Sequence, residues 1–323
     1  MEKVFSAMQP TGRLHIGNYL GALRQWVALQ KEYKCIFGIV DYHAITVKFP
    51  PERMKERILN TAIDYLAAGL NPKKSIIFVQ SDRPEHTELA WILGCLTSIG
   101  ALQRMTQFKE KSEKYKSNVN AGLFTYPVLQ AADILIYKAD AVPVGEDQVQ
   151  HVELTRDIAR KFNQKYGSIF PEPKALVSEG ARILGLDGKG KMSKSNAEHT
   201  YISLSDTSEQ IKEKISGATT DKGNEPKISR GSRNLIGLLE IFAGEDAAKK
   251  YWREREKGTI KYAEMKEVLA EAIIKALSPI QAKRTELERN PAEVKKILEL
   301  GASKLAKPAQ QTIKEVKKVI GLT

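Results

Sequence analysis

The sequence predicts an α/β protein built around a parallel sheet, followed by an all-helical part. Short apolar runs at residues 4–8, 35–40 and 75–79 alternate with helical spacing, which is typical of strands joined by crossover helices. The runs are apolar throughout, as expected for strands that helices cover on both faces of the sheet. After about residue 205 the strand signals fade and amphipathic helical stretches replace them.

The individual elements follow from the same patterns. Strands or buried apolar segments are expected at residues 4–8, 35–40, 75–79, 131–137 and 141–144. Helices are expected at residues 15–29, 51–68, 209–216, 234–242, 262–288 and 293–305. Between these groups lie a proline-rich turn that ends near Ala175 and a glycine-rich basic loop that begins at Gly185. No convincing strand is expected directly before that loop.

Length and composition narrow the class of protein. The chain has 323 residues and 42% hydrophobic content, enough for about two domains with sizeable cores. The apolar runs are too short for a signal peptide or a membrane span, so a cytoplasmic protein without a membrane partner is expected. Cys35 and Cys95 both lie in apolar surroundings and are expected to be buried, reduced thiols. The net charge of +12 fits a polyanionic partner or simply a lysine-rich surface.

The first candidate site follows the first strand. The turn from Gln9 to Gly12 leads into a helix near His15, whose unpaired backbone N–H groups favour a phosphate. His15 and Asn18 share one face of the first helical turn, and Gly17 between them allows a flat ring to approach the backbone. The alternative is an ordinary helix start with a surface His and Asn.

The second candidate site is the loop that ends in Lys191-Met192-Ser193-Lys194-Ser195. Two ammonium groups on such a loop can close over a triphosphate and stabilise charge on departing pyrophosphate. One alternative is a solvated linker. Another is a P-loop starting at Gly185, but Met192 replaces the Ser or Thr that such a loop needs. A dehydrogenase is disfavoured because no Gly-x-Gly-x-x-Gly follows the first strand.

Taken together, the two motifs resemble the signature pair of class I aminoacyl-tRNA synthetases. His15-Ile16-Gly17-Asn18 is similar to the HIGH motif, with Asn18 in place of its last His, and residues 191–195 match the KMSKS motif in full. The Asn variant is usual among tryptophanyl enzymes. Further segments similar to the tryptophanyl-tRNA synthetase family lie at residues 9–12, 40–44, 104–109, 126–133 and 142–148, with His151, Glu153 and Arg156 after them.

This resemblance implies a domain organisation. A Rossmann-type catalytic domain is expected at 1–190, with a connective insertion around 45–120, and a helical anticodon-binding domain at 191–285. C-terminal helices are expected at 286–323, for which packing against the catalytic domain is one arrangement. The family also implies a homodimer. The cysteine-bound iron–sulfur cluster of some relatives is not expected, because no cysteine follows Cys95.

The resemblance also assigns residues to the substrates. Asp133 is expected to accept a hydrogen bond from the indole N–H of tryptophan. A carboxylate in its apolar run is costly unless it is paired, and the alternative is a capping or salt-bridged Asp. Further tryptophan contacts are implied for Phe5, His43, Gln130, Val142 and Val144, with Tyr126 and Gln148 at the amino group. ATP contacts are implied for Gln9, Pro10, Thr11, Gly17, Asn18, Gly145, Glu146, Asp147, Ile183, Lys191, Met192, Ser193, Lys194 and Ser195. The implied catalytic residues are His15, Asn18, Lys109, Lys111, Lys191 and Lys194; for Lys109 and Lys111 the alternative is two surface lysines.

The implied reaction activates L-tryptophan with ATP and then charges tRNA(Trp). The attacking carboxylate is already ionised, so the first step needs placement and electrostatics rather than a protein base. Mg²⁺ is expected to be held mainly by phosphates and water, with no protein metal site. No editing activity is expected, because a pocket that requires an N–H partner rejects most competitors. Two alternatives are tyrosine specificity and a synthetase-like nucleotide- or RNA-binding protein without activity.

Overall fold

The structure, a computed structural model, describes residues 1–108, 113, 119–177, 183–194 and 196–323. The chain divides into two compact units. The first comprises Met1–Thr11, Ala22–Glu179 and Asn290–Thr323, and the second comprises Gly12–Gly21 and Gly180–Arg289. The functional domains expected at 1–190, 191–285 and 286–323 remain a prediction.

The first unit is built on a five-stranded sheet, which confirms the predicted fold class. The strands are β1 (Lys3–Met8), β2 (Lys34–Ile39), β3 (Ser75–Val79), β4 (Ala141–Val144) and β5 (Lys174–Val177). Their order is β3-β2-β1-β4-β5, and every pairing is parallel. This is the doubly wound order, in which the crossover direction reverses between β1 and β4. Strand β5 was not predicted from the sequence, because its apolar run is only three residues long and directly follows a proline-rich turn.

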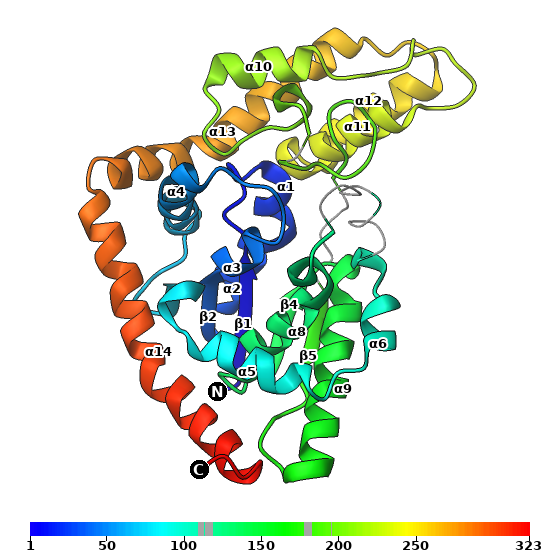
Figure 1. Ribbon diagram of the computed structural model, residues 1–323. Helices are drawn as coiled ribbons and strands as arrows, with labels where there is room; N and C mark the ends of the chain where they lie inside the picture. Colours follow the sequence, from blue (N-terminus) through cyan, green and yellow to red (C-terminus); the bar gives the residue numbers. More distant parts are fainter. Residues whose placement is uncertain (109–112, 114–118, 178–182, 195) are drawn as a thin grey trace. The chain divides into compact units, whose positions relative to one another are not determined.

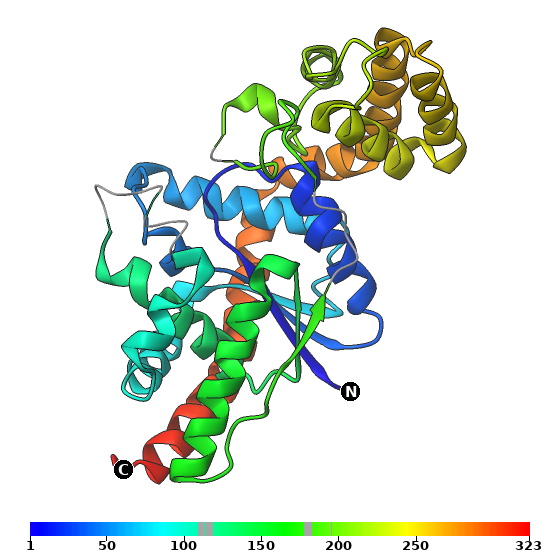
Figure 2. The same ribbon diagram turned by 90° about the vertical axis from the view of Figure 1, so that its right-hand side faces the viewer.

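Helices cover this sheet and bury its apolar strands (Figures 1 and 2). They are α2 (Arg24–Leu29), α3 (Asp41–Ala44), α4 (Met54–Ala67), α5 (Glu85–Gly94), α6 (Ile99–Gln103), α8 (Ala121–Leu135), α9 (Val149–Tyr166) and α14 (Pro291–Val319). The expected apolar segment at 131–137 is the end of α8 and the turn after it. One aromatic cluster stacks Trp26 on Phe37 with ring centroids 4.7 Å apart, and the Tyr65 ring meets Trp26 edge-on at 5.4 Å. Such pairs add about 0.5–1.5 kcal/mol beyond their buried area.

The last helix of the first unit packs closely on the sheet. Gly301 of α14 lies so near β3 that a Cβ atom there would be 1.9 Å from the carbonyl oxygen of Ile77. Only glycine allows this approach of helix and strand backbones. Cys35 is buried, as expected from the sequence, but the same expectation is wrong for Cys95, which is exposed because it lies at the C-terminal cap of α5, beyond the helix.

The second unit is mostly helical. It holds α1 (Ile16–Asn18) and α10 to α13, which span Ser208–Ser216, Arg230–Ala243, Glu245–Glu256 and Tyr262–Glu288. In Figure 2 these last four helices are drawn from green to orange. A π-helical turn, Tyr19–Leu23, connects α1 to α2. Of the helices in the described residues, none combines the length and apolar character needed to cross a membrane.

Candidate active site

Polar residues and a glycine follow the strands at the carboxyl edge of the sheet. Gln9 follows β1, Asp41 follows β2, Gln80 follows β3 and Gly145 follows β4. Because all the strands are parallel, their carboxyl ends meet at one edge, and the crevice of a doubly wound sheet opens where the strand order reverses. The predicted ATP residues of this unit, Gln9, Pro10, Thr11, Gly145, Glu146 and Asp147, all follow β1 or β4, the two strands that flank this reversal.

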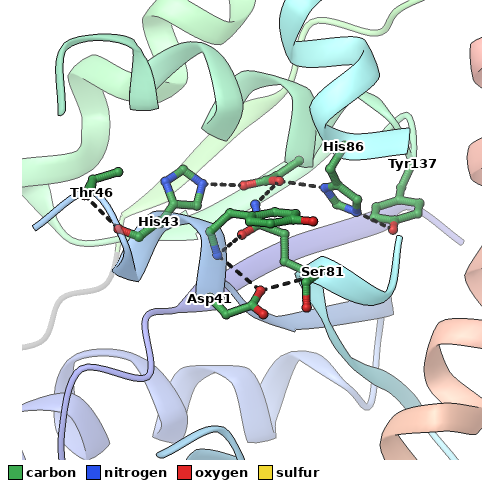
Figure 3. A network of polar contacts seen from close by, with 9 residues as sticks. Asp41, His43, Thr46, Ser81, His86 and Tyr137 are labelled. Atoms are coloured by element: carbon green, nitrogen blue, oxygen red, sulfur yellow. Dashed lines mark hydrogen bonds and ion pairs between the residues drawn. The ribbon is translucent and has the colours of Figure 1, made fainter. Parts of the chain in front are cut away.

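The centre of the first unit's polar network is the carboxylate of Asp133 on α8. This residue is 1% exposed. His86 Nδ1 lies 2.6 Å and Gln80 Nε2 2.7 Å from Oδ1, and His43 Nε2 lies 2.7 Å from Oδ2 (Figure 3). A carboxylate oxygen only accepts, so each of these nitrogens must carry a hydrogen. The three donors compensate the cost of burying the charge.

The protonation of Asp133 follows from these contacts. Burial by itself would raise the pKa of this carboxyl group, but the charge of His43 and the hydrogen bonds from His43 and His86 outweigh burial and hold the pKa below its ordinary value. Asp133 is therefore ionised at neutral pH. A buried anion that accepts from three donors retains further acceptor capacity, since a carboxylate offers about four lone pairs.

A second layer of bonds fixes the donors. Gln80 is fully buried and accepts from the backbone N–H of Tyr42 at 3.2 Å while its amide donates to Asp133. Asp41 Oδ1 accepts from the backbone N–H of Ser81 at 3.0 Å, which ties the segment after β2 to the segment after β3 (Figure 3). The ends of two neighbouring strands are thereby locked together around Asp133.

The other predicted tryptophan residues lie in the same unit. Phe5 and Val142 are buried on β1 and β4, and Gln130, Val144 and Gln148 are half-buried. The Tyr126 hydroxyl lies 2.8 Å from His151 Nε2, and the Tyr126 ring meets the His43 ring edge-on with centroids 6.2 Å apart. Tyr126 is thereby linked to Asp133 through His43.

The first motif lies in the second unit and forms a reciprocal cap. His15 is the residue before α1: its Nδ1 accepts from the Asn18 backbone N–H at 3.3 Å, and Asn18 Oδ1 accepts from the His15 backbone N–H at 3.2 Å. A Cβ atom on Gly17 would lie 2.9 Å from His15 Nδ1, so glycine is needed for the ring to occupy this place. The pairing of Ile16 N–H with Ile202 O at 2.9 Å holds the motif to a distant segment.

The lysine motif ends a tight hairpin of the same unit. The backbone N–H of Met192 donates to Ile183 O at 2.9 Å, and that of Gly185 donates to Gly190 O at 3.0 Å. Gly188 and Gly190 have φ values of +70° and +55°, which favour glycine. The Lys194 ammonium donates to the carbonyl of Gly12 at 3.4 Å, just before the first motif. The two motifs, about 176 residues apart in the chain, therefore meet in one compact unit.

Burial and the nearby lysines of the second motif determine the protonation state of His15. The residue is 4% exposed, and burial, followed by the charges of Lys194 and Lys191, lowers its pKa to about 3. A neutral ring agrees with the geometry, because Nδ1 can accept from Asn18 only without its own hydrogen. The cationic groups at this motif are the lysines rather than the histidine.

The structure does not describe every predicted site residue, and it adds residues that were not predicted. Lys109, Lys111 and Ser195 lie outside the described residues. Three members of the Asp133 network were not singled out from the sequence: Gln80, His86 and Tyr137. Gln80 carries a usable signal, because a polar residue directly after an apolar strand marks the sheet edge. His86 shares its helix face with Leu89 and Leu93, which points it inward but says nothing of its partner.

Comparison with known proteins decides the family. The sequence profile of the family described as tRNA synthetases class I (W and Y) matches residues 1–278. The chain belongs to this family. The synthetase is 45% identical over 327 residues to the tryptophan–tRNA ligase of Wolinella succinogenes, with 99% of each chain covered. The resemblance predicted from the two motifs is thus confirmed.

Solved structures agree with this assignment. The tryptophanyl-tRNA synthetase of Campylobacter jejuni, complexed with ADP and tryptophan, superposes on the synthetase with a TM-score of 0.85 at 38% identity, covering 99% of this chain and 100% of that one. The tryptophanyl-tRNA synthetase of Mycoplasma pneumoniae gives a TM-score of 0.87 at 33% identity, covering 100% of this chain and 98% of that one. The tyrosyl-tRNA synthetase of Aeropyrum pernix, at 20% identity and a TM-score of 0.67, shows the shared fold alone.

Proposed function

We propose that the synthetase activates L-tryptophan with ATP to tryptophanyl-adenylate and pyrophosphate, and then esterifies the 3′ end of tRNA(Trp). The observation that carries the proposal is the ionised, buried carboxylate of Asp133, which suits the indole N–H, a group that only donates. The relatives in Wolinella succinogenes and Campylobacter jejuni, both named for tryptophan, support the same substrate.

The rest of the pocket provides shape and polarity for tryptophan. In this proposal the buried side chains of Phe5 and Val142 and the half-buried side chains of Val144 and Gln130 form the wall for the flat ring system. Tyr126 and Gln148 are assigned to the substrate's amino group. His43 donates to Asp133 through Nε2 and thereby helps to keep the carboxylate anionic.

Catalysis of the first step rests on placement and charge. The tryptophan carboxylate attacks the α-phosphorus of ATP, and pyrophosphate leaves. In this proposal Lys191 and Lys194 stabilise the charge that moves onto the pyrophosphate, while Asn18 and a neutral His15 shape the phosphate site. Their contacts within one compact unit support a shared role. Lys109 and Lys111 are assigned the same charge-stabilising role.

Magnesium belongs to the proposal as an ion that arrives on the phosphates of ATP. Within the described residues no three His, Cys, Asp or Glu side chains are grouped to hold a metal. Mg²⁺ readily keeps water and phosphate oxygens as ligands, so it can be held through the phosphates while the lysines and backbone N–H groups contact other phosphate oxygens. When bound, it would neutralise part of the polyphosphate charge.

The proposal extends to partners and location. The helical domain at 191–285 is assigned to the anticodon of tRNA(Trp), and the synthetase is proposed to be cytoplasmic, where tRNA is charged. A homodimer is supported by Trp91, 76% exposed on α5, and Ile99, 66% exposed at the start of α6, since large apolar side chains exposed on the surface are typical of interfaces. Sedimentation at micromolar concentration tests the dimer, and a monomer would contradict it.

Amino-acid-dependent exchange between ATP and pyrophosphate tests the function. We expect exchange with tryptophan and none above background with tyrosine, because the phenol ring is smaller than indole and carries its donor at a different place, so it neither fills the pocket nor aligns with Asp133. Exchange with tyrosine alone would refute the proposal. The expected absence of editing is checked by incubating mischarged tRNA(Trp) with the synthetase, and hydrolysis of the mischarged tRNA would contradict that expectation.

A further inference from the structure

The bonds around Asp133 are unevenly distributed between its two oxygens. Oδ1 accepts from Gln80 and His86, at 2.7 and 2.6 Å, whereas Oδ2 accepts from His43 alone, at 2.7 Å. Each carboxylate oxygen has about two lone pairs. Oδ1 is therefore saturated, and the free acceptor capacity of Asp133 lies on Oδ2, the oxygen that His43 also contacts (Figure 3).

His86 is held in one orientation from its far side. Its Nε2 lies 2.6 Å from the hydroxyl of Tyr137, and both side chains are buried. Because Nδ1 must donate to Asp133, Nε2 is the ring nitrogen that bonds to the Tyr137 hydroxyl, and the two contacts together fix the orientation of the ring. Burial, followed by the charges of Asp133 and Glu85, raises the pKa of Tyr137, which therefore keeps its proton.

Tyr137 is itself fixed by aromatic packing. Its ring stacks on Phe5 with centroids 6.1 Å apart and meets Phe78 edge-on at 5.8 Å. Phe78 lies on β3 and Phe5 on β1, so the core of the sheet sets the position of the Tyr137 hydroxyl. The chain of contacts runs from the sheet through Tyr137 and His86 to the carboxylate.

We propose that His86, oriented by Tyr137, is a positioning residue for amino-acid selection: it saturates Asp133 Oδ1 and thereby directs the one remaining acceptor position, on Oδ2, to the N–H of the substrate ring. The inference rests on the proposed function, since it concerns how tryptophan is chosen. His86 does not contact the substrate in this account. It acts through the orientation and charge of Asp133, as an orienting partner does for a functional side chain.

The competing explanation is that His86 only stabilises the buried charge. A purely structural role would lower activity equally with every substrate, whereas a positioning role changes selection for the N–H group. The two are separated by comparing tryptophan with its benzothiophene analogue, in which sulfur replaces the indole N–H and cannot donate. The readout is the ratio of kcat/KM for tryptophan to kcat/KM for the analogue in pyrophosphate exchange.

Three variants grade the effect. His86→Leu removes both hydrogen bonds, Tyr137→Phe removes only the hydroxyl, and His86→Asn keeps an amide N–H near the place of Nδ1. We expect His86→Leu to lower the ratio about tenfold or more, because hydrogen bonds to charged groups are worth roughly that factor. We expect Tyr137→Phe to lower the ratio by a smaller factor and His86→Asn to restore most of the wild-type ratio.

His151→Asn is the matched control, because His151 is also a buried histidine bonded to a tyrosine hydroxyl, that of Tyr126. Tryptophan and the analogue carry the same amino group, so this variant should affect both equally. An unchanged ratio in His86→Leu and Tyr137→Phe, or a ratio in His86→Asn as low as in His86→Leu, would overturn the inference. If His86→Leu does not fold, Tyr137→Phe and His86→Asn decide alone. Wild-type protein without tryptophan-dependent exchange would instead refute the proposed function.

Discussion

Replacing Asp133 with Asn tests the tryptophan site most sharply, because the amide keeps the shape of the side chain and removes one acceptor. Two donors, Gln80 and His86, face Oδ1, whereas only His43 faces Oδ2. The amide oxygen of the variant should therefore turn toward Gln80 and His86. Its NH2 group then faces His43, which can change tautomer and accept, and the indole N–H, which cannot.

The loss consequently falls on tryptophan rather than on the fold. A hydrogen bond to a charged group contributes about 1.5–3 kcal/mol, and a buried unpaired donor costs about 1–3 kcal/mol more. We expect the two to sum to about 3 kcal/mol or more, which lowers kcat/KM for tryptophan by on the order of a hundredfold. The KM for ATP should stay within about twofold, as expected of a change confined to the amino-acid pocket.

Steady-state pyrophosphate exchange measures both parameters, and thermal unfolding checks that the variant folds. Asp221→Asn is the matched control. Asp221 is another buried carboxylate with an arginine and a tyrosine as partners, in the helical unit. This control should lower the unfolding temperature and leave kcat/KM for tryptophan unchanged. A loss of less than about threefold in Asp133→Asn would refute the assignment of this carboxylate to the indole.

Three further predictions test other parts of the structure. Gly301→Ala should lower the free energy of unfolding, measured by urea denaturation, by about 3 kcal/mol or more, because the new Cβ atom would collide with the carbonyl oxygen of Ile77. The control is Gly237→Ala, which should not lower the free energy of unfolding, because no atom lies within 4 Å of the new Cβ. Lys194→Ala should lower kcat for exchange by about a hundredfold with little effect on KM for tryptophan, and a change below twofold would contradict its role. The pKa of His15 is about 3 in the folded chain and 6.5 in the unfolded chain, so between these values only the unfolded chain binds the proton. Lowering the pH from 7 to 5 should therefore reduce the free energy of unfolding by about 2 kcal/mol more in wild type than in His15→Asn. Equal pH dependence in the two proteins would contradict this.

Local sequence patterns were sufficient to predict most of the strands and helices. The strands at Ser75–Val79 and Ala141–Val144 and the helix at Tyr262–Glu288 begin and end where periodicity places them. The missed strand, Lys174–Val177, is held at the sheet edge by pairing with β4 rather than by its own apolar content. Such a strand depends on tertiary contacts, which local propensity does not record.

The candidate site was predictable to a different degree in each unit. The two signature motifs were found because their residues are contiguous. That the two motifs lie in one compact unit could not be predicted, because this depends on backbone pairings between residues distant in the chain, such as Ile16 with Ile202. The same holds for the partners of Asp133: its apolar neighbours signal that it needs donors, but nothing local identifies His86 or Tyr137.

The most direct test of the account is a crystal structure of the synthetase with tryptophan and a non-hydrolysable ATP analogue. It should show the indole nitrogen about 3 Å from Asp133 Oδ2, with Oδ1 still bonded to His86, and the phosphates between Asn18 and Lys194. An indole nitrogen bonded to another group, or phosphates beyond the reach of both motifs, would contradict it.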